Sequence, residues 1–142
     1  MKKARVIFTV IAFLFVGSLV LHAAVPNIVG SWTGTGKAVG IEHGYYNVTY
    51  SVTITDQNGN LFRGSIKITT PMGSFTQKFT GVIKTDNTIA ANYRESTGDK
   101  ITEAVSFGKY IAPTAKQPKP GYEGYWLNSL SQDTGTMSLL KK

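Results

Sequence analysis

The sequence offers few side chains whose type and spacing suit catalysis. Beyond the first 24 residues it contains one histidine, His43, and the whole chain has no cysteine. Neither a two-histidine metal site nor a Cys/His pair can be built from such a set. His43 follows Glu42 in a glycine-rich stretch, where we expect a solvated side chain rather than a member of a Ser/His/Asp triad. We therefore predict no catalytic residue, no metal site and no cofactor.

The carboxylates are explained mostly by turns. Aspartate is favoured in turns because its side chain caps the local backbone, which accounts for Asp56, Asp86, Asp99 and Asp133. Glu103 differs, because it shares the two-residue phase of Ile101 and Val105. Either it points into a barrel, where an unpaired carboxylate is costly, so that it pairs with a basic residue or its pKa rises, or a bulge or register shift places it outside, facing a lysine.

The aromatic side chains are more informative. They fall mostly on the apolar faces of predicted strands, at Tyr46, Tyr50, Phe62, Phe75, Phe79, Tyr93, Phe107 and Trp126. Two interpretations stay open: they line a cavity for an apolar or planar ligand, or they fill the interior completely. For the first we predict an interior lined by Tyr50, Phe79, Tyr93 and Phe107, and a ligand site made by these four residues and Trp126.

Two-residue alternation positions these side chains. Residues 46–55 alternate apolar or aromatic with polar, which is typical of a half-buried strand. The pair Asn58 and Gly59 that follows is a strong hairpin signal. Further strands are predicted at residues 28–36, 61–69, 74–84, 88–95, 101–112, 122–130 and 136–142, and no stretch has helical spacing over more than a turn.

Eight strands joined mostly by short turns predict an all-β, antiparallel up-and-down barrel. A meander of this length usually closes, because closure removes exposed sheet edges. The first strand, with Gly30, Gly34 and Gly36 around Trp32, is expected to pair with the last strand where the barrel closes. Residues 37–44 and 113–124 are predicted as long loops, and strand parity puts them at opposite ends.

A basic start followed by an uncharged run at residues 6–21 has the layout of a signal peptide. We expect residues 1–24 to be a cleaved signal peptide or an uncleaved anchor, and residues 25–142 to be one barrel domain. The domain is therefore expected to be secreted or otherwise extracytoplasmic.

The net charge of +7 falls to +4 without the leader, because twelve basic residues then face eight acidic ones. The basic residues are scattered rather than clustered. No nucleic-acid partner is therefore expected, and membrane contact only through an uncleaved leader.

Gly30, Ser31 and Trp32, with Lys141 or Lys142 at the end of the last strand, resemble the calycin group of small barrels, which includes lipocalins and avidin-like proteins. The resemblance implies that Trp32 closes the barrel floor and that a basic side chain, Lys141 in our prediction, lies across it as a cation–π contact. It does not extend to the biotin site, since Gly34 stands where avidin-like barrels have asparagine.

We expect a non-enzymatic binding module for a small apolar or amphipathic ligand. One alternative is a solid-core barrel acting as a protein-interaction module or protease inhibitor at the cell envelope. Another is a barrel-type cyclase or isomerase, which requires a buried Glu103 or tyrosine beside a cavity. Oligomers are compatible with each of these.

Overall fold

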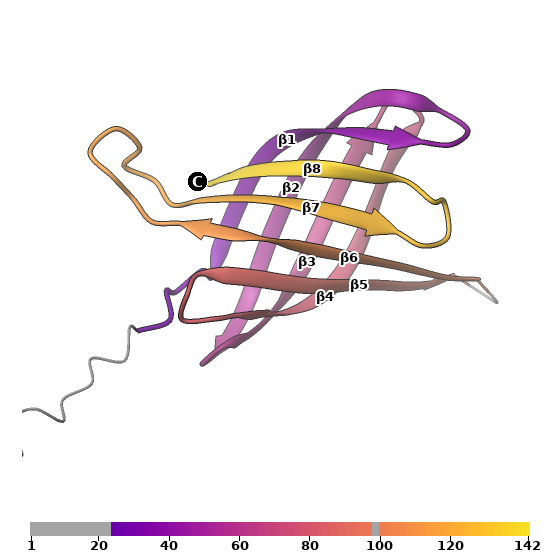
Figure 1. Cartoon of the computed structure of the whole chain (residues 1–142). Helices are drawn as coiled ribbons and strands as arrows, with labels where there is room; N and C mark the ends of the chain where they lie inside the picture. The colour runs from indigo at the N-terminus through magenta and orange to yellow at the C-terminus, as the bar shows by residue number, and fades with distance from the viewer. Residues whose placement is uncertain (1–23, 98–99) are drawn as a thin grey trace, which may run out of the picture.

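Eight strands form a closed barrel in sequence order. The computed structural model describes residues 24–97 and 100–142. Each strand is antiparallel to the next, and β1 also pairs with β8, which confirms the predicted up-and-down barrel of the calycin-like type (Figure 1). The strands are β1 (Gly30–Gly40), β2 (Gly44–Asn58), β3 (Leu61–Thr70), β4 (Gly73–Ile83), β5 (Thr88–Thr97), β6 (Lys100–Ile111), β7 (Gly121–Asn128) and β8 (Thr134–Lys141).

The apolar and polar residues that alternate along β2 are alternately buried and exposed. Tyr50, Val52 and Ile54 are buried in the barrel, and the polar residues between them are exposed. The predicted hairpin turn follows, with Gly59 in the left-handed region at a φ of 58°. Its lack of a Cβ makes that conformation accessible, so the chain reverses tightly into β3.

Closure brings β1 and β8 together. Gly34 lies opposite Leu139 in this pairing, and a Cβ on Gly34 would collide with the backbone carbonyl oxygen of Ser138. The pairing continues past the strand end, where the Lys142 amide donates to the Ser31 carbonyl at 2.9 Å. Gly34 thus permits the close backbone approach that was expected of the first strand.

Several predicted boundaries are wrong. The loop predicted at residues 113–124 is shorter, because residues 121–124 belong to β7, and two further errors concern the closing strands. Residues 37–40, assigned to a long loop, continue β1 and pair with residues 44–47 of β2, so the connection is only residues 41–43. The last strand begins at Thr134 rather than at residue 136. The predicted leader, apart from Ala24, lies outside the described residues.

The two ends of the barrel carry different connections. We call "mouth" the end with the turns at residues 41–43, 71–72 and 129–133, and "floor" the end with residues 24–29 and the segment 112–120. The proline-rich segment projects from the floor, opposite the β7–β8 turn, as Figure 1 shows. The two predicted loops therefore do lie at opposite ends. Of these two, the short β1–β2 turn is at the mouth and the proline-rich segment is at the floor.

Candidate functional site

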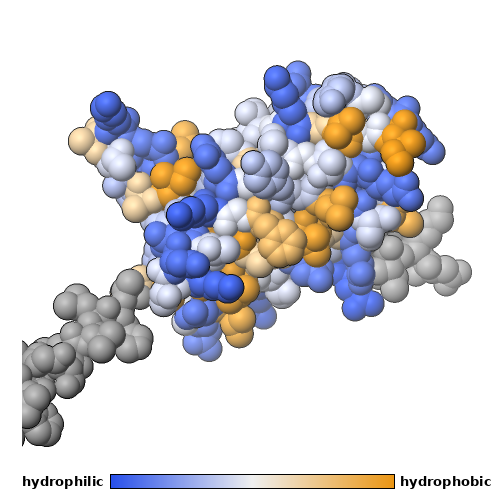
Figure 2. All heavy atoms as spheres, viewed as in Figure 1, coloured by the Kyte–Doolittle hydropathy of each residue, from blue (hydrophilic) through white to orange (hydrophobic). Residues whose placement is uncertain are grey.

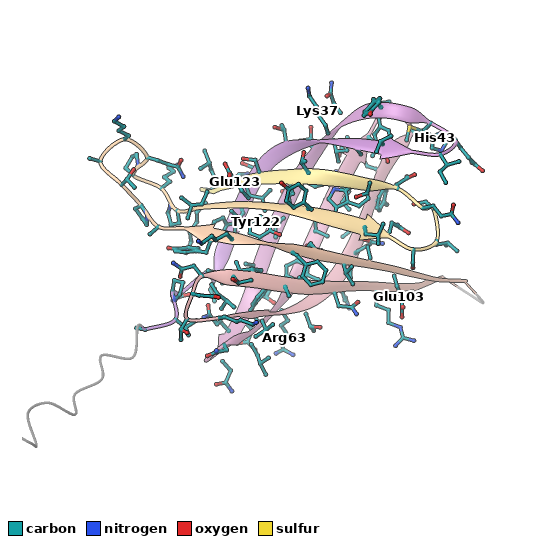
Figure 3. The ribbon with its side chains drawn as sticks, in the orientation of Figure 1. Lys37, His43, Arg63, Glu103, Tyr122 and Glu123 are labelled. Carbon is teal, nitrogen blue, oxygen red and sulfur yellow. The ribbon has the colours of Figure 1, made fainter. Side chains whose placement is uncertain are left out.

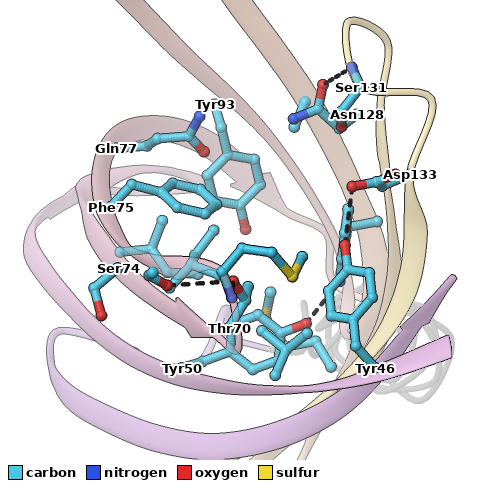
Figure 4. Close-up of a pocket in the computed structure, with 18 of the residues that line it drawn as sticks. Tyr46, Tyr50, Thr70, Ser74, Phe75, Gln77, Tyr93, Asn128, Ser131 and Asp133 are labelled. Atoms are coloured by element: carbon cyan, nitrogen blue, oxygen red, sulfur yellow. Dashed lines mark hydrogen bonds between the residues drawn. The ribbon is translucent and has the colours of Figure 1, made fainter. Parts of the chain in front are cut away.

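The barrel interior is hollow at the mouth and filled at the floor. A cavity of about 490 Å³ opens at the mouth and is shown in Figure 4. Its apolar lining includes Val48, Ile66, Ile68, Phe75 and Met137. A much smaller space of about 40 Å³ lies deeper, toward the floor, and Tyr93 and Met137 border both spaces. These two side chains therefore separate the cavity from the packed half.

Trp32 closes the floor, as the resemblance implied. Its ring is buried, and its indole Nε1 donates to the Ile28 carbonyl at 2.9 Å. The Nζ atom of Lys141 lies 5.8 Å from the ring centroid, within the range of a cation–π contact. The same end is packed by Phe62 and Phe79, whose ring centroids are 6.1 Å apart.

Four of the five predicted ligand-site residues are placed inside. Tyr50, Tyr93 and Trp126 line the cavity at the mouth. Phe79 is also interior, but it borders the small space, and its ring packs 5.4 Å from that of Tyr93. The structure therefore brings three of the predicted residues together at the cavity and assigns Phe79 to the packed core.

Phe107 is the exception, and its predicted position is wrong. Its side chain is 58% exposed on the outer face of β6. The inward residues of β6 are instead Ala104, Ser106, Gly108 and Tyr110. Small residues are needed there because large rings from neighbouring strands fill the interior: a Cβ on Gly108 would lie 2.6 Å from the ring of Tyr122. The apolar phase of this strand thus marks its outer face.

Glu103 also lies on the outer face of β6, because it shares the two-residue phase of Phe107. Its side chain is 53% exposed on the outside of the barrel, as Figure 3 shows. Its carboxylate Oε1 lies 3.7 Å from Nε of Arg94 on β5. Glu103 is therefore outside, as the second alternative had it, but the pairings of β6 with β5 and β7 show no bulge or register shift among the described residues, and the facing cation is an arginine rather than a lysine.

Two hydrogen-bonded pairs of polar groups project into the cavity. Indole Nε1 of Trp126 donates to the Tyr50 hydroxyl at 2.7 Å, and that hydroxyl donates to the Thr136 carbonyl at 3.0 Å. Nearer the mouth, the Tyr46 hydroxyl donates to Oδ2 of Asp133 at 2.9 Å. The cavity therefore combines apolar walls with a few fixed polar groups, which is typical of a small-molecule site.

Glycines on the closing strands make room for these side chains. A Cβ on Gly36 would lie 3.1 Å from the Tyr50 ring, and one on Gly135 would lie 2.8 Å from the Trp126 ring. A Cβ on Gly40 would collide with the Asp133 carboxylate. The glycines near the seam thus serve the site as well as the closure.

The cavity tyrosines are protonated at neutral pH. Burial raises the pKa of Tyr50 to about 12, and burial followed by the hydrogen bond and charge of Asp133 raises that of Tyr46 to about 12. Burial also raises the pKa of Tyr93 well above its ordinary value. These hydroxyls therefore act as hydrogen-bond donors rather than as bases.

Sequence reasoning missed two polar residues of the cavity, Asp133 and Gln77, both of which are buried. The signal was present in the strand phase. Asp133 shares the parity of Met137 and Leu139 on β8, and Gln77 shares that of Phe79 on β4. Asp133 was passed over because it was assigned to a turn, and Gln77 because no polar residue was expected among the inward side chains.

The comparisons with known proteins leave the geometry as the basis for function. A scan against protein-family models found no match, and neither did a search of curated proteins.

In residues 24–97 and 100–142, no helix is long and apolar enough to cross a membrane. Among these residues, no three His, Asp or Glu side chains converge as a metal site.

Proposed function

We propose that this barrel is a non-enzymatic binding module that takes up a small apolar or amphipathic molecule through its mouth. The observation that carries the proposal is the cavity of about 490 Å³, which lies within the size range of small-molecule sites. The signal-peptide layout of the first 24 residues supports a role outside the cytoplasm.

Binding accounts for the polar groups better than catalysis does. Glu103, the carboxylate that a barrel cyclase would use, is on the outer surface. The tyrosines beside the cavity keep their protons, and Tyr50 is already engaged with Trp126 and Thr136. Fixed donors within an apolar wall orient a ligand and give specificity.

The test compares two matched alanine substitutions. Ala104 is buried and lines the cavity, whereas Ala115 is exposed on the segment 112–120 at the floor. The neutral dye N-phenyl-1-naphthylamine, which fluoresces in apolar surroundings, is titrated into wild type, Ala104→Phe and Ala115→Phe. We expect wild type and Ala115→Phe to bind alike and Ala104→Phe to bind about tenfold more weakly or worse, a loss of at least about 1.4 kcal/mol.

Failure of wild type to bind the dye, or equal binding by Ala104→Phe, would overturn the cavity as the site. Native mass spectra of the freshly purified protein, taken before and after denaturation and refolding, add an independent reading. A co-purifying mass that is lost on denaturation supports the proposal and identifies the cargo.

A second candidate function, protein interaction, is favoured by a separate observation. Apolar side chains lie in register across the outer face of five neighbouring strands, and Figure 2 shows apolar residues gathered in the middle of the side that faces the viewer. Three of them are large and well exposed, Leu61 at 66%, Phe107 at 58% and Tyr125 at 70%. Contiguous exposed apolar surface often marks an interface. This outer apolar row consists of Leu61, Val82, Ala90, Phe107 and Tyr125.

The partner that this face fits is a second copy of the chain. Lys109 and Glu123 are exposed register partners beside Phe107 and Tyr125 on β6 and β7. With a twofold axis running between these strands, Phe107 faces the partner's Tyr125 and Lys109 faces the partner's Glu123. In this arrangement, both the aromatic rings and the charged side chains of one copy face complementary side chains of the other copy.

Sedimentation velocity over a concentration series tests this arrangement. We expect a dimer that the single reversal Lys109→Glu weakens and the double swap Lys109→Glu with Glu123→Lys restores, because only the swap keeps opposite charges facing each other. A wild type that is monomeric throughout, or a swap no better than the single reversal, would contradict it.

A further inference from the structure

The Asp133 carboxylate at the mouth has an unusual environment. The residue is only 9% exposed, and the hydrogen bond to its side chain among the described residues comes from the neutral hydroxyl of Tyr46, at 2.9 Å from Oδ2. Its other oxygen, Oδ1, lies against Gly40, where only the absence of a Cβ leaves it space. The cavity wall therefore holds the Asp133 carboxylate by the Tyr46 hydrogen bond and by the space beside Gly40.

No cation balances this carboxylate within the part of the chain that the structure describes. The two ion pairs there, Arg63 with Asp56 and Arg94 with Glu103, lie on the outer surface. Buried charges in proteins are ordinarily paired, because removing an ion from water costs far more than one neutral hydrogen bond returns. An ionised carboxylate can also accept about four hydrogen bonds.

Beneath this carboxylate the wall becomes aromatic and apolar. One inward position deeper on the neighbouring strands lie Gly135 and Trp126, which are register partners, and the Trp126 indole is fixed by Tyr50. Ile66 and Met137 continue the wall below. A ligand lying along the barrel axis thus meets a negative charge first and apolar surface next.

We propose that the cavity selects cationic amphiphiles: molecules with one protonated amine, held by Asp133, and an apolar or aromatic body lying against Trp126 and the walls below. This inference rests on the proposed ligand-binding function and names the class of ligand. An ammonium group supplies both the missing charge and several donors, and charge-assisted hydrogen bonds are about twice as strong as neutral ones. The faces of Tyr46 and Trp126 favour a cation beside them as well.

The experiment uses three probes that share one body and differ in head group. These are 2-phenylethylamine, the neutral 2-phenylethanol and the anionic phenylacetate, each measured at pH 7 by displacement of N-phenyl-1-naphthylamine. Wild type is expected to bind the amine about tenfold more tightly than the alcohol, and phenylacetate more weakly than either.

Asp133→Asn is the decisive variant, because the asparagine side-chain oxygen can still accept from Tyr46 while the charge is lost. Its own affinity for the dye is measured first, and it is expected to lose the tenfold preference for the amine over the alcohol. Asp56→Asn is the control, since it also removes one aspartate charge but at an exposed position on the outer surface. The control should keep the preference.

Each outcome has a separate meaning. If the dye itself does not bind wild type, the proposed function fails and the selectivity fails with it. If the dye binds but the alcohol and the amine bind alike, or Asp133→Asn keeps the preference, the cation selectivity is wrong and the cavity remains. A far-ultraviolet circular dichroism spectrum like that of wild type shows that Asp133→Asn is folded.

Discussion

The floor and mouth halves of the barrel are built from the same strands but solve different problems. At the floor, Trp32 and Phe62 pack in an interior where the open space falls to about 40 Å³. At the mouth, the same strands carry tyrosines, Asp133 and Trp126 around a cavity of about 490 Å³. Packed apolar side chains stabilise a fold, whereas hollow walls with fixed polar groups suit a ligand. The comparison indicates that stability is concentrated at one end and specificity at the other.

The two tryptophans give the largest test of this division. Trp32→Ala empties the packed floor, so the free energy of unfolding should fall by about 3–5 kcal/mol. Trp126→Ala removes a half-buried ring beside open space and should cost about 1–2 kcal/mol. Urea unfolding followed by circular dichroism measures both. Equal losses would mean that the mouth half contributes as much stability as the floor.

Alkaline pH probes the mouth through Tyr50. Its pKa is raised from about 10 in the unfolded chain to about 12, so its stabilisation is complete below pH 10 and is lost as pH rises toward 12. Allowing for solvent screening, the loss should be about 1–2 kcal/mol. Urea midpoints between pH 8 and 11.5 should fall less steeply in Tyr50→Phe than in wild type. Tyr125→Phe, at an exposed position, should match wild type, and a similar slope in all three would contradict the assignment.

A matched pair of tyrosines sharpens the comparison at the boundary between the two halves. The Tyr122 hydroxyl is buried and makes no hydrogen bond of good geometry among the described residues, although Ser106 lies near it, whereas the Tyr93 hydroxyl bonds Ser106 at 3.0 Å. Tyr122→Phe should therefore leave the free energy of unfolding unchanged or raise it by up to about 1 kcal/mol. Tyr93→Phe should lower it by about 1 kcal/mol, because Ser106 is left buried without its partner. Thermal unfolding of both variants would detect the opposite signs, and a loss in both would show that Tyr122 has a polar partner such as ordered water.

The smallest expected effect is at Lys141. Lys141→Met keeps most of the side chain over Trp32 and removes its charge, so the free energy of unfolding should fall by about 0.5–1 kcal/mol. Lys142→Met is the control, since Lys142 is exposed. Urea midpoints that do not differ between these two variants would show that the contact adds nothing beyond packing.

Much of the fold could be predicted from the sequence because period-two alternation and turn residues are local signals. The strand count, the barrel closure and the Asn58-Gly59 turn follow from such signals, whereas the position of Trp32 at the floor was implied by the resemblance to calycin barrels. The end of β1 did not, because residues 37–40 look like a loop by composition. They become a strand by pairing with β2, and that pairing is set by the register of the hairpin.

The site was harder to predict because the face of a strand that points inward depends on the side chains of the neighbouring strands. On β6 Phe107 points outward, since Tyr93 and Tyr122 already occupy the interior beside Ser106 and Gly108. Asp133 looks like an ordinary turn aspartate until β8 is extended back by parity from Leu139. A single sequence gives the phase of each strand but not which phase faces in.

The Gln57 side chain fixes the start of the described chain at the floor of the barrel, and this determines which end of the barrel a tether holds. It binds the chain just before β1, accepting from the Ile28 amide at 2.9 Å and donating to the Pro26 carbonyl at 3.0 Å. The C-terminal Lys142 is tied to Ser31 at the same end. A tether on either end of the described chain, whether a bilayer anchor, a fused partner or a sensor chip, therefore grips the floor and leaves the mouth facing outward to passing molecules.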